Sequence, residues 1–525
     1  MKGVAAVFGI VVGLDAVVVL WWVTPAGGVA LLIIYSAAAA GVLIRRWSMC
    51  LHAPRGWSLG RGVELSDPDR PQRVRDAMVS DAVLKLGVLA VGNPGAGKTE
   101  SVALGLLDSF ASARPEGGWA YFEGKGDTDI YKKAVAMGAR IDHFFSTEWP
   151  GSDSVNLMEG AGADVVDRLT RMLIGKSTAT DYYADLQRAM LHRVVPVLCA
   201  LPVPVCLRDL YVVLTDDGAA HETLRLAREA GVDATAVALW TQTLARPREQ
   251  RVSELAGLLN RLFLFVNGPL APRLNAYAPT LCVAHAVAAG RTVYFHLPLT
   301  EVARDVAVAL VEMFGVQARH RQLSETDAPL YPLVFDDWGR FFHDHFGPFS
   351  ARCRSANMPL MFCFQSRAQL DAVSPTFAQE LDDNTATKVI LRVTGEATVQ
   401  YALRLLGESE RAAVAVSDYG AGGATQLAMQ REPRLVAQQL RELAPGEAYV
   451  STLLETERGR WRNPLWRLQL PLPPMSAWRD VRLPAQTPAD PGVGLGLWSR
   501  YVDPETVKAL NDTLLAQARA HEVRA

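Results

Sequence analysis

Two long apolar runs open the chain and set it apart from the rest of the sequence. Residues 3–23 (GVAAVFGIVVGLDAVVVLWWV) are about as long as a helix that crosses a bilayer, and they contain one charged residue, Asp15. A second run at 29–44 follows the break TPAGG. Because Lys2 precedes the pair and Arg45 and Arg46 follow it, we expect a two-helix transmembrane hairpin at residues 1–46 with both ends in the cytoplasm. The alternative, a cleaved signal peptide, fits less well because the first run is too long and a second run follows.

Asp15 indicates how the hairpin packs within the membrane. An unpaired carboxylate in the middle of a membrane span is costly, so a partner or protonation is expected there. Both readings favour an oligomer within the lipid bilayer.

The pattern changes after Arg46, where short apolar runs alternate with helical patterns. This alternation is typical of an α/β fold with a largely parallel sheet. Long helical patterns such as ADLQRAMLHRVVPVLCAL then replace the strands, which predicts an inserted helical domain. Beyond residue 455 the chain is rich in Pro and Gly, so we expect an extended or disordered tail with a final helix capped by Asp503. The predicted domains are residues 1–46, 47–155, 156–278, 279–455 and 456–525, with polar loops at HAPRGWSLGRG and ELSDPDRPQR.

Composition narrows the possible functions. The 525 residues include 53 Lys and Arg against 55 Asp and Glu, a net charge of −2. This balance excludes a globally basic coat protein for nucleic acid, so any nucleic-acid contact must be local. The six cysteines stand singly, without ligand spacing, which argues against a disulfide framework or a zinc site.

The strongest chemical signal is a phosphate-binding loop. The apolar run LKLGVLAV leads into GNPGAGKT and then into the helical pattern ESVALGLLDSF, which is the strand, loop and helix order of a P-loop. The glycines let the backbone wrap a phosphate, Lys98 supplies a cation for the β and γ phosphates, and Thr99 supplies an oxygen for Mg²⁺. The predicted nucleotide-binding residues are Gly92, Asn93, Pro94, Gly95, Ala96, Gly97, Lys98, Thr99 and Glu100.

A pair of carboxylates follows the apolar strand in YPLVFDDWGRF. We expect Asp336 to hold Mg²⁺ through its water shell and Asp337 to orient or deprotonate the attacking water. A solvated acidic turn at the end of a strand is the alternative. Because Asp is one methylene shorter than Glu, a base built on Asp337 would hydrolyse slowly or need closure of the site.

A third strand, PLMFCF, ends directly at Gln365, whose amide could sense the γ-phosphate or hold the water. Arg354 lies before this strand and therefore near the opposite end of the sheet. From there it could reach a neighbouring subunit's nucleotide in a ring, as an arginine finger does, and Arg352 competes for that role. A helix-capping Gln and a surface Arg are the alternatives for Gln365 and Arg354.

The order of these features resembles the conjugative coupling proteins of type IV secretion systems, the TraD and TraG group, whose motor core is similar to the FtsK and HerA translocases. The resemblance covers nearly all of residues 1–455. It rests on the hairpin followed by GNPGAGKT, YFEGKGD, a helical insertion, TVYFHLP, LVFDDW, FCFQSRAQL, NTATKVILRV and LAPGEAYV. It implies an α/β, RecA-like P-loop motor domain with an inserted all-alpha domain. It also implies a homohexamer in the bacterial inner membrane.

The resemblance further implies the chemistry and the partners. Lys98 and Thr99 would bind ATP and Mg²⁺, Asp336 and Asp337 would form the hydrolytic pair, and Gln365 and Arg354 would act as sensor and trans-acting finger. The implied partners are single-stranded DNA with its relaxase or relaxosome, and the inner-membrane components of the secretion channel. Three departures from the family pattern are Asp337 at a usual Glu, Glu123 at a common Asp, and almost no loop between the two membrane runs.

Two smaller clusters carry weaker hypotheses. The segment LARPREQR holds Arg246, Arg248 and Arg251, which could contact DNA phosphates or could form a solvated turn. The pair His343 and His345 could mimic metal ligands, but alternating residues after an ATPase strand favour a surface loop instead.

The leading hypothesis is an inner-membrane ATPase that recruits DNA with its attached relaxase and feeds single-stranded DNA into a conjugation channel. A second hypothesis makes the chain an ATP-gated receptor and scaffold that does not pump. A third, an FtsK-type translocase, predicts a C-terminal winged helix for which the tail is too short and too rich in Pro.

Overall fold

A computed structural model describes residues 56–65, 73–175, 182–324, 328–341, 346–372, 375–417, 424–455, 461–485 and 492–502. The chain divides into two units, Met1–Gly56 and Trp57–Ala525, and the fold below is that of the second. The predicted membrane hairpin lies outside the described residues. None of the helices within the described ranges is long and apolar enough to cross a membrane.

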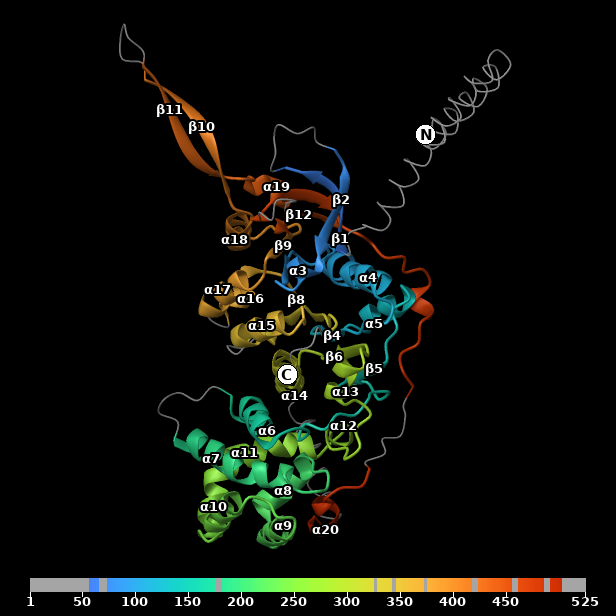
Figure 1. Ribbon diagram of the computed structural model, residues 1–525, viewed down its shortest axis with the longest axis vertical. Coiled ribbons are helices and arrows are strands. Elements are labelled where there is room, and N and C mark those ends of the chain that lie inside the picture. Colours follow the sequence, from blue (N-terminus) through green and yellow to red (C-terminus); the bar gives the residue numbers. More distant parts are fainter. Residues whose placement is uncertain are drawn as a thin grey trace, which may run out of the picture. The chain divides into compact units, whose positions relative to one another are not determined.

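An eleven-stranded mixed sheet forms the centre of the second unit (Figure 1). Its strand order is β2-β1-β15-β12-β9-β3-β8-β7-β4-β6-β5, and the seven strands from β9 to β5 run parallel. Among the remaining pairs, β9–β12, β12–β15 and β15–β1 are antiparallel. The strands are β1 (Gly56–Glu64), β2 (Arg75–Ser80), β3 (Val88–Val91), β4 (Ala120–Glu123), β5 (His143–Ser146), β6 (Val293–His296), β7 (Leu333–Asp336), β8 (Leu360–Phe364), β9 (Thr387–Ile390), β12 (Glu447–Ser451) and β15 (Leu465–Gln469).

Each parallel strand is apolar on both sides because helices cover both faces of the sheet. In β3, Leu89 and Val91 enter one hydrophobic core, while Val88 and Ala90 enter the other. Continuous apolar runs are typical of such doubly covered strands, so the expectation of an α/β fold is confirmed. The helices around the sheet are α3 (Asp81–Leu84), the π-helical turn η1 (Lys98–Ala103), α4 (Leu104–Ala113), α5 (Thr128–Ala136), α13 (Val283–Ala288), α14 (Glu301–Leu323), η3 (Trp338–Arg340), α15 (Phe346–Ser355), α16 (Arg367–Asp371), α17 (Pro375–Asp383), α18 (Glu396–Leu406) and α19 (Ala437–Arg441).

The predicted helical insertion lies between β5 and β6. It consists of α6 (Gly162–Leu169), η2 (Thr170–Ile174), α7 (Tyr182–Cys199), α8 (Leu207–Thr215), α9 (Asp217–Glu229), α10 (Ala234–Leu244), α11 (Arg248–Val266) and α12 (Ala271–Leu274). Two ion pairs, Arg171 with Glu312 and Arg319 with Asp164, join it to α14 of the motor. The helical domain is therefore continuous with the core beneath the sheet.

Two segments that the sequence assigns to loop or tail are strands of the main sheet. β1 begins within HAPRGWSLGRG and ends at Glu64, the first residue of ELSDPDRPQR, and β15 lies beyond residue 455. β1 is hard to recognise because Gly60 and Gly62 interrupt its alternation. At Gly62 a Cβ atom would stand 1.9 Å from the carbonyl oxygen of Arg467 on β15, so the close pairing of the two strands requires glycine there.

Two strand pairs lie outside the main sheet. β10 (Glu408–Ser417) and β11 (Ala424–Pro433) form a long antiparallel hairpin, which the sequence pattern did not indicate (Figure 1). β13 (Leu454–Glu455) and β14 (Trp461–Arg462) form a short one.

The tail is ordered at both of its described stretches. After β15 it forms the 3-10 turn η4 (Trp478–Asp480), and the indole of Trp149 donates a hydrogen bond to the carbonyl of Pro484. Farther on, α20 (Leu497–Tyr501) packs on α8 of the helical domain (Figure 1). The tail therefore spans from the sheet to the insertion, and the predicted final helix beyond Asp503 lies outside the described residues.

Asp209 joins the tail to the helical domain. Its fully buried carboxylate accepts hydrogen bonds from the backbone N–H of Cys206 at 3.0 Å, from the hydroxyl of Tyr277 at 3.0 Å, and from the backbone N–H of Leu497 at 2.9 Å. Burial raises the pKa of Asp209, and its hydrogen-bond donors act in the opposite direction.

Replacement of Asp209 by Ala should leave three buried donors without their acceptor. We expect the free energy of unfolding to fall by about 2–4 kcal/mol and α20 to become sensitive to protease. Urea unfolding and limited proteolysis of the full chain measure both effects. Asp185→Ala, at an exposed ion pair with Arg188 on α7, is the control and should change stability by less than about 0.5 kcal/mol. Equal effects of the two variants would contradict the role of Asp209.

Candidate functional site: a P-loop pocket

The predicted P-loop joins β3 to η1. Gly95 and Gly97 have φ of 73° and 101°, values that L side chains rarely adopt, so these two glycines are needed for the turn. The ammonium of Lys98 is buried and donates hydrogen bonds to the carbonyl oxygens of Gly92 at 2.8 Å and Asn93 at 3.3 Å. Pro94, Gly95 and the stretch Gly97 to Glu100 line the pocket.

The other predicted P-loop residues do not line the pocket but contact segments that pack against the loop. Gly92 lies against Leu391, the Asn93 amide donates to the hydroxyl of Thr394 at 2.6 Å, and the carbonyl of Ala96 accepts from the backbone N–H of Gly446 at 3.0 Å. The structure thus divides the nine predicted residues into a lining set and a supporting set.

Asp336, at the end of β7, meets the P-loop directly. Its Oδ2 accepts hydrogen bonds from the hydroxyl of Thr99 at 2.7 Å and from the phenol of Tyr121 at 2.8 Å. Its Oδ1 is buried and lacks a hydrogen-bond partner among the described residues. Burial, reinforced by the neighbouring Asp337, raises the pKa of Asp336 to about 6. A carboxylate oxygen without a partner beside a threonine hydroxyl is a donor set that fits Mg²⁺.

The next residue, Asp337, has φ 48° and ψ 35°, in the left-handed region. This backbone conformation is uncommon for any residue with a Cβ atom and is found most often at Asn and Asp. Its Oδ1 accepts a hydrogen bond from the side-chain amide of Gln365 at 3.0 Å. Both side chains line the same pocket.

The sheet order explains why Gln365 is there. β8 lies between β3 and β7, so its carboxyl end brings Gln365 between the P-loop and the acidic pair. The backbone N–H of Gln365 donates to the side-chain oxygen of Gln369 at 2.8 Å. Gln369 of the motif QSRAQL therefore holds the backbone of Gln365. The sequence predicted the polar group at this strand end, and the strand order decided its neighbours.

The turn after β4 adds residues that the sequence reading did not assign to the site. Glu123 is fully buried, and its carboxylate accepts hydrogen bonds from the backbone N–H groups of Lys125 at 2.8 Å, Gly126 at 2.8 Å and Asp127 at 3.1 Å. Burial raises the pKa of Glu123 to about 8, while these three donors act in the opposite direction. The motif YFEGKGD marks this segment in the sequence. The sequence does not show which way its side chains point, so the role of Glu123 could not be predicted.

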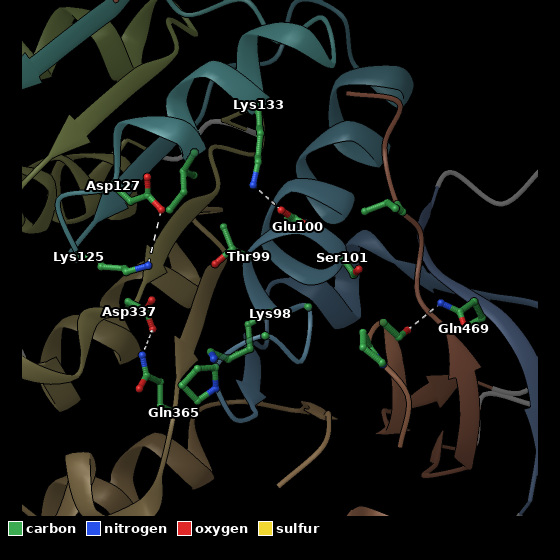
Figure 2. A pocket seen from close by; sticks show the side chains of 17 residues that line it. Lys98, Thr99, Glu100, Ser101, Lys125, Asp127, Lys133, Asp337, Gln365 and Gln469 are labelled. Carbon is green, nitrogen blue, oxygen red and sulfur yellow. Dashed lines mark hydrogen bonds and ion pairs between the residues drawn. The ribbon is translucent and has the colours of Figure 1, made fainter. Parts of the chain in front are cut away.

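The pocket encloses about 510 Å³ and extends well past the P-loop (Figure 2). At one end lie Lys98, Asp337 and Gln365, and at the other end lies Gln469 of β15, whose side-chain amide donates to the carbonyl of Gly446 at 3.2 Å. Leu472 also lines the cavity. These two residues come from the segment that the sequence assigned to the tail, so the far end of the pocket could not be predicted.

Arg354 stands apart from this pocket. It is exposed on α15, which precedes β8, and it does not line the cavity around its own P-loop. Arg352 is exposed on the same helix. Neither arginine lines the pocket of this chain, and the role of Arg354 as a finger stays a prediction.

The two weaker hypotheses concerned the arginines of LARPREQR and the pair His343 and His345. In LARPREQR, Arg251 is buried, and its Nη2 donates to both carboxylate oxygens of Asp217 at 2.7 and 2.9 Å, while Arg246 pairs with Glu254 at 2.5 Å. Arg251 and Arg246 are therefore engaged by carboxylates within the helical domain. Arg248 is exposed and donates a hydrogen bond to the carbonyl of Thr215 at 3.0 Å. His343 and His345 lie outside the described residues.

Comparison with known proteins bears on this arrangement. Residues 334–445, which hold Asp336, Asp337 and Gln365, match a family model described as the TraM recognition site of TraD and TraG. The resemblance to TraD and TraG is confirmed over these residues. The P-loop lies outside the matched residues, and no curated protein matches the chain.

Solved structures match the chain at low sequence identity. The plasmid coupling protein TrwB in complex with the non-hydrolysable ATP analogue ADPNP is 16% identical, with a TM-score of 0.50 over 74% of this chain and 86% of TrwB. VirB4 of Thermoanaerobacter pseudethanolicus is 14% identical, with a TM-score of 0.49 over 79% of this chain and 96% of VirB4. The TrwB similarity shows that the α/β sheet with its helices follows a known fold.

The buried carboxylate of Asp336 should cost stability when no cation is bound. Its pKa in the unfolded chain is about 3.9, so the folded protein loses about 3 kcal/mol as the pH rises from about 4 through about 6. Asp336→Asn keeps an acceptor for Thr99 and Tyr121 without the charge. We therefore expect this variant to be more stable than the wild type by up to about 3 kcal/mol at pH 8 and by little at pH 4.

Urea unfolding of the full chain with a chelator, repeated between pH 4 and pH 8, measures this difference. Asp185→Asn on the exposed face of α7 is the control and should shift stability equally little at every pH. A difference between wild type and Asp336→Asn that does not change with pH would show that folding does not shift the pKa of Asp336.

Proposed function

We propose that this protein is an ATPase that couples a DNA substrate with its relaxase to a type IV secretion channel and drives transfer by ATP hydrolysis. The observation that carries the proposal is the meeting of three strand ends in one pocket. Thr99 contacts Asp336 at 2.7 Å, and Asp337 accepts a hydrogen bond from Gln365 at 3.0 Å. This set contains a phosphate cradle, a metal-binding carboxylate and a polar pair able to hold a water.

Each residue has a distinct task in the proposed hydrolysis. The amides of the P-loop and the ammonium of Lys98 bind the β and γ phosphates, and the start of η1 adds a favourable dipole. Thr99 and Asp336 hold Mg²⁺, which when bound offsets phosphate charge. Asp337 takes or orients the proton of the attacking water, and Gln365 holds Asp337 in place. ATP with Mg²⁺ is the proposed cofactor, and ADPNP, the ligand in the TrwB structure, is an ATP analogue.

The coupling role rests on the family match. A segment related to the TraM recognition site of TraD and TraG supports an interaction with the relaxosome. The proposed location is the bacterial inner membrane, with the hairpin of residues 1–46 as anchor and both ends in the cytoplasm; its support is the apolar pattern. The proposed assembly is a homohexamer that contacts the inner-membrane components of the channel.

Arg354 is the proposed trans-acting finger of this ring. Its exposure on α15, away from the pocket of its own chain, supports a role at the neighbouring subunit's nucleotide. Such a cation stabilises the charge that develops on the transferred phosphoryl group.

ATP hydrolysis by the full-length protein, measured with and without single-stranded DNA, tests the proposal. We expect DNA to stimulate turnover, Lys98→Ala to abolish it, and Arg354→Ala to lower it at least about a hundredfold while nucleotide binding is kept. Because the finger acts between subunits, mixing the two inactive variants should restore part of the activity. Arg352→Ala, on the same helix, is the matched control for Arg354→Ala.

The outcomes separate the hypotheses. Loss of turnover in Arg352→Ala alone would move the finger to that residue, and no restoration on mixing would reject a trans-acting arginine. Nucleotide binding without turnover under every DNA condition would reject the motor. It would favour the ATP-gated receptor.

A further inference from the structure

Three lysines line the pocket, and they differ in how firmly they are held. Lys98 is hydrogen-bonded to carbonyl oxygens of the P-loop. Lys133 pairs with Glu100 at 2.5 Å, and its ammonium lies 4.9 Å from the ring centroid of Trp478. The ion pair that Lys125 makes, with Asp127, is longer, at 3.6 Å, and its side chain is 59% exposed. Lys125 is therefore the cation that can change its partner at the lowest cost.

The backbone beneath Lys125 is fixed despite this exposure. The carboxylate of Glu123 holds the turn by three backbone N–H groups, among them that of Lys125. Gly126 has φ 83°, and a Cβ atom there would lie 2.8 Å from Pro298. Asp127 ends the turn as the N-cap of α5, since its Oδ1 accepts from the backbone N–H of Asp129 at 2.9 Å. The turn thus presents Lys125 from a defined position.

That position is on the hydrolytic side of the pocket. Glu123 is the register partner of Asp336 across β4 and β7. A Cβ atom on Gly124 would lie 2.9 Å from the carbonyl oxygen of Asp337, so the two turns touch because residue 124 has no side chain. In Figure 2, Lys125, Asp337 and Gln365 lie on one side of the cavity, far from Gln469.

The charged side chains of the pocket determine which lysine can neutralise a bound phosphate. Its lining has three ammonium groups and three carboxylates, from Glu100, Asp127 and Asp337, so they balance one another. A triphosphate adds several negative charges. Lys98 is bonded to neutral carbonyl oxygens, whereas Lys125 and Lys133 can neutralise the added charge only by leaving their carboxylate partners. The weak pair of Lys125 with Asp127 is the one most easily exchanged for phosphate.

We propose that Lys125 is a second phosphate-binding cation, which contacts the terminal phosphate of ATP in its own subunit and which Glu123 positions. This inference rests on the proposed function and adds a cis cation to Lys98. In the free protein Lys125 pairs with Asp127, and in the complex it exchanges that carboxylate for the phosphate. ADP, which lacks the terminal phosphate, does not engage it.

The test compares two nucleotides on the full-length protein. Dissociation constants for ADPNP and for ADP are measured with Mg²⁺, together with kcat for ATP. For Lys125→Ala we expect about tenfold weaker binding of ADPNP, unchanged binding of ADP, and at least about a tenfold lower kcat, because one charge-assisted contact is lost. Lys125→Arg should restore most of the ADPNP affinity. Lys132→Ala is the matched control, since Lys132 lies on α5, pairs with Asp129 at 3.5 Å and does not line the pocket.

Glu123→Gln tests the positioning role. It should weaken ADPNP in the same way and leave ADP binding unchanged, with a thermal melt to establish that the variant is folded. A merely structural role would weaken both nucleotides together.

The inference would be overturned if Lys125→Ala bound ADPNP and ADP with the same ratio of affinities as the wild type. A wild-type protein that binds neither nucleotide would overturn the proposed function itself, and the inference with it. The two failures are distinguishable because the wild type is measured first.

Discussion

The buried carboxylate of Asp336 is the interaction on which the site depends. Removing an ionised carboxylate from water is costly unless hydrogen bonds or a cation replace the lost solvation. Here Thr99 and Tyr121 donate to one oxygen, and the other lacks a protein partner within the described chain. The carboxylate is thus compensated only in part. The deficit, visible as a pKa raised to about 6, is what a cation beside Thr99 would relieve.

Two turns on either side of Asp336 are organised around the same constraint. Asp337 takes a left-handed conformation that directs its carboxylate to Gln365. Glu123, on the neighbouring strand, uses three backbone N–H groups to hold the turn that contacts the carbonyl of Asp337 through Gly124. Strain and buried charge are concentrated at the carboxyl ends of β4 and β7, and the apolar strands behind them supply the rigidity that keeps both.

The tail connects parts of the unit that are distant in sequence. Its strand β15 pairs with β1 and β12 of the main sheet and contributes Gln469 to the pocket. Trp478 then lies under Lys133, which pairs with Glu100 beside Thr99. At its end, Leu497 donates its backbone N–H to Asp209 in the helical domain. A single segment therefore touches both the nucleotide pocket and the insertion.

The sequence by itself determined the α/β class, the helical insertion, the P-loop, the acidic pair and Gln365. Each of these features depends on residues that are contiguous in the sequence. A phosphate-binding turn needs glycines at fixed spacing, and a strand covered on both faces needs an unbroken apolar run. The tertiary structure decided which strands are neighbours, and so brought Gln365 between Thr99 and Asp337. It also decided the roles of Glu123 and Lys125, the far end of the pocket at Gln469, and the pairing of the glycine-rich β1 with β15. These depend on backbone hydrogen bonds and side-chain directions between distant segments, for which a local pattern of apolar and polar residues carries no record.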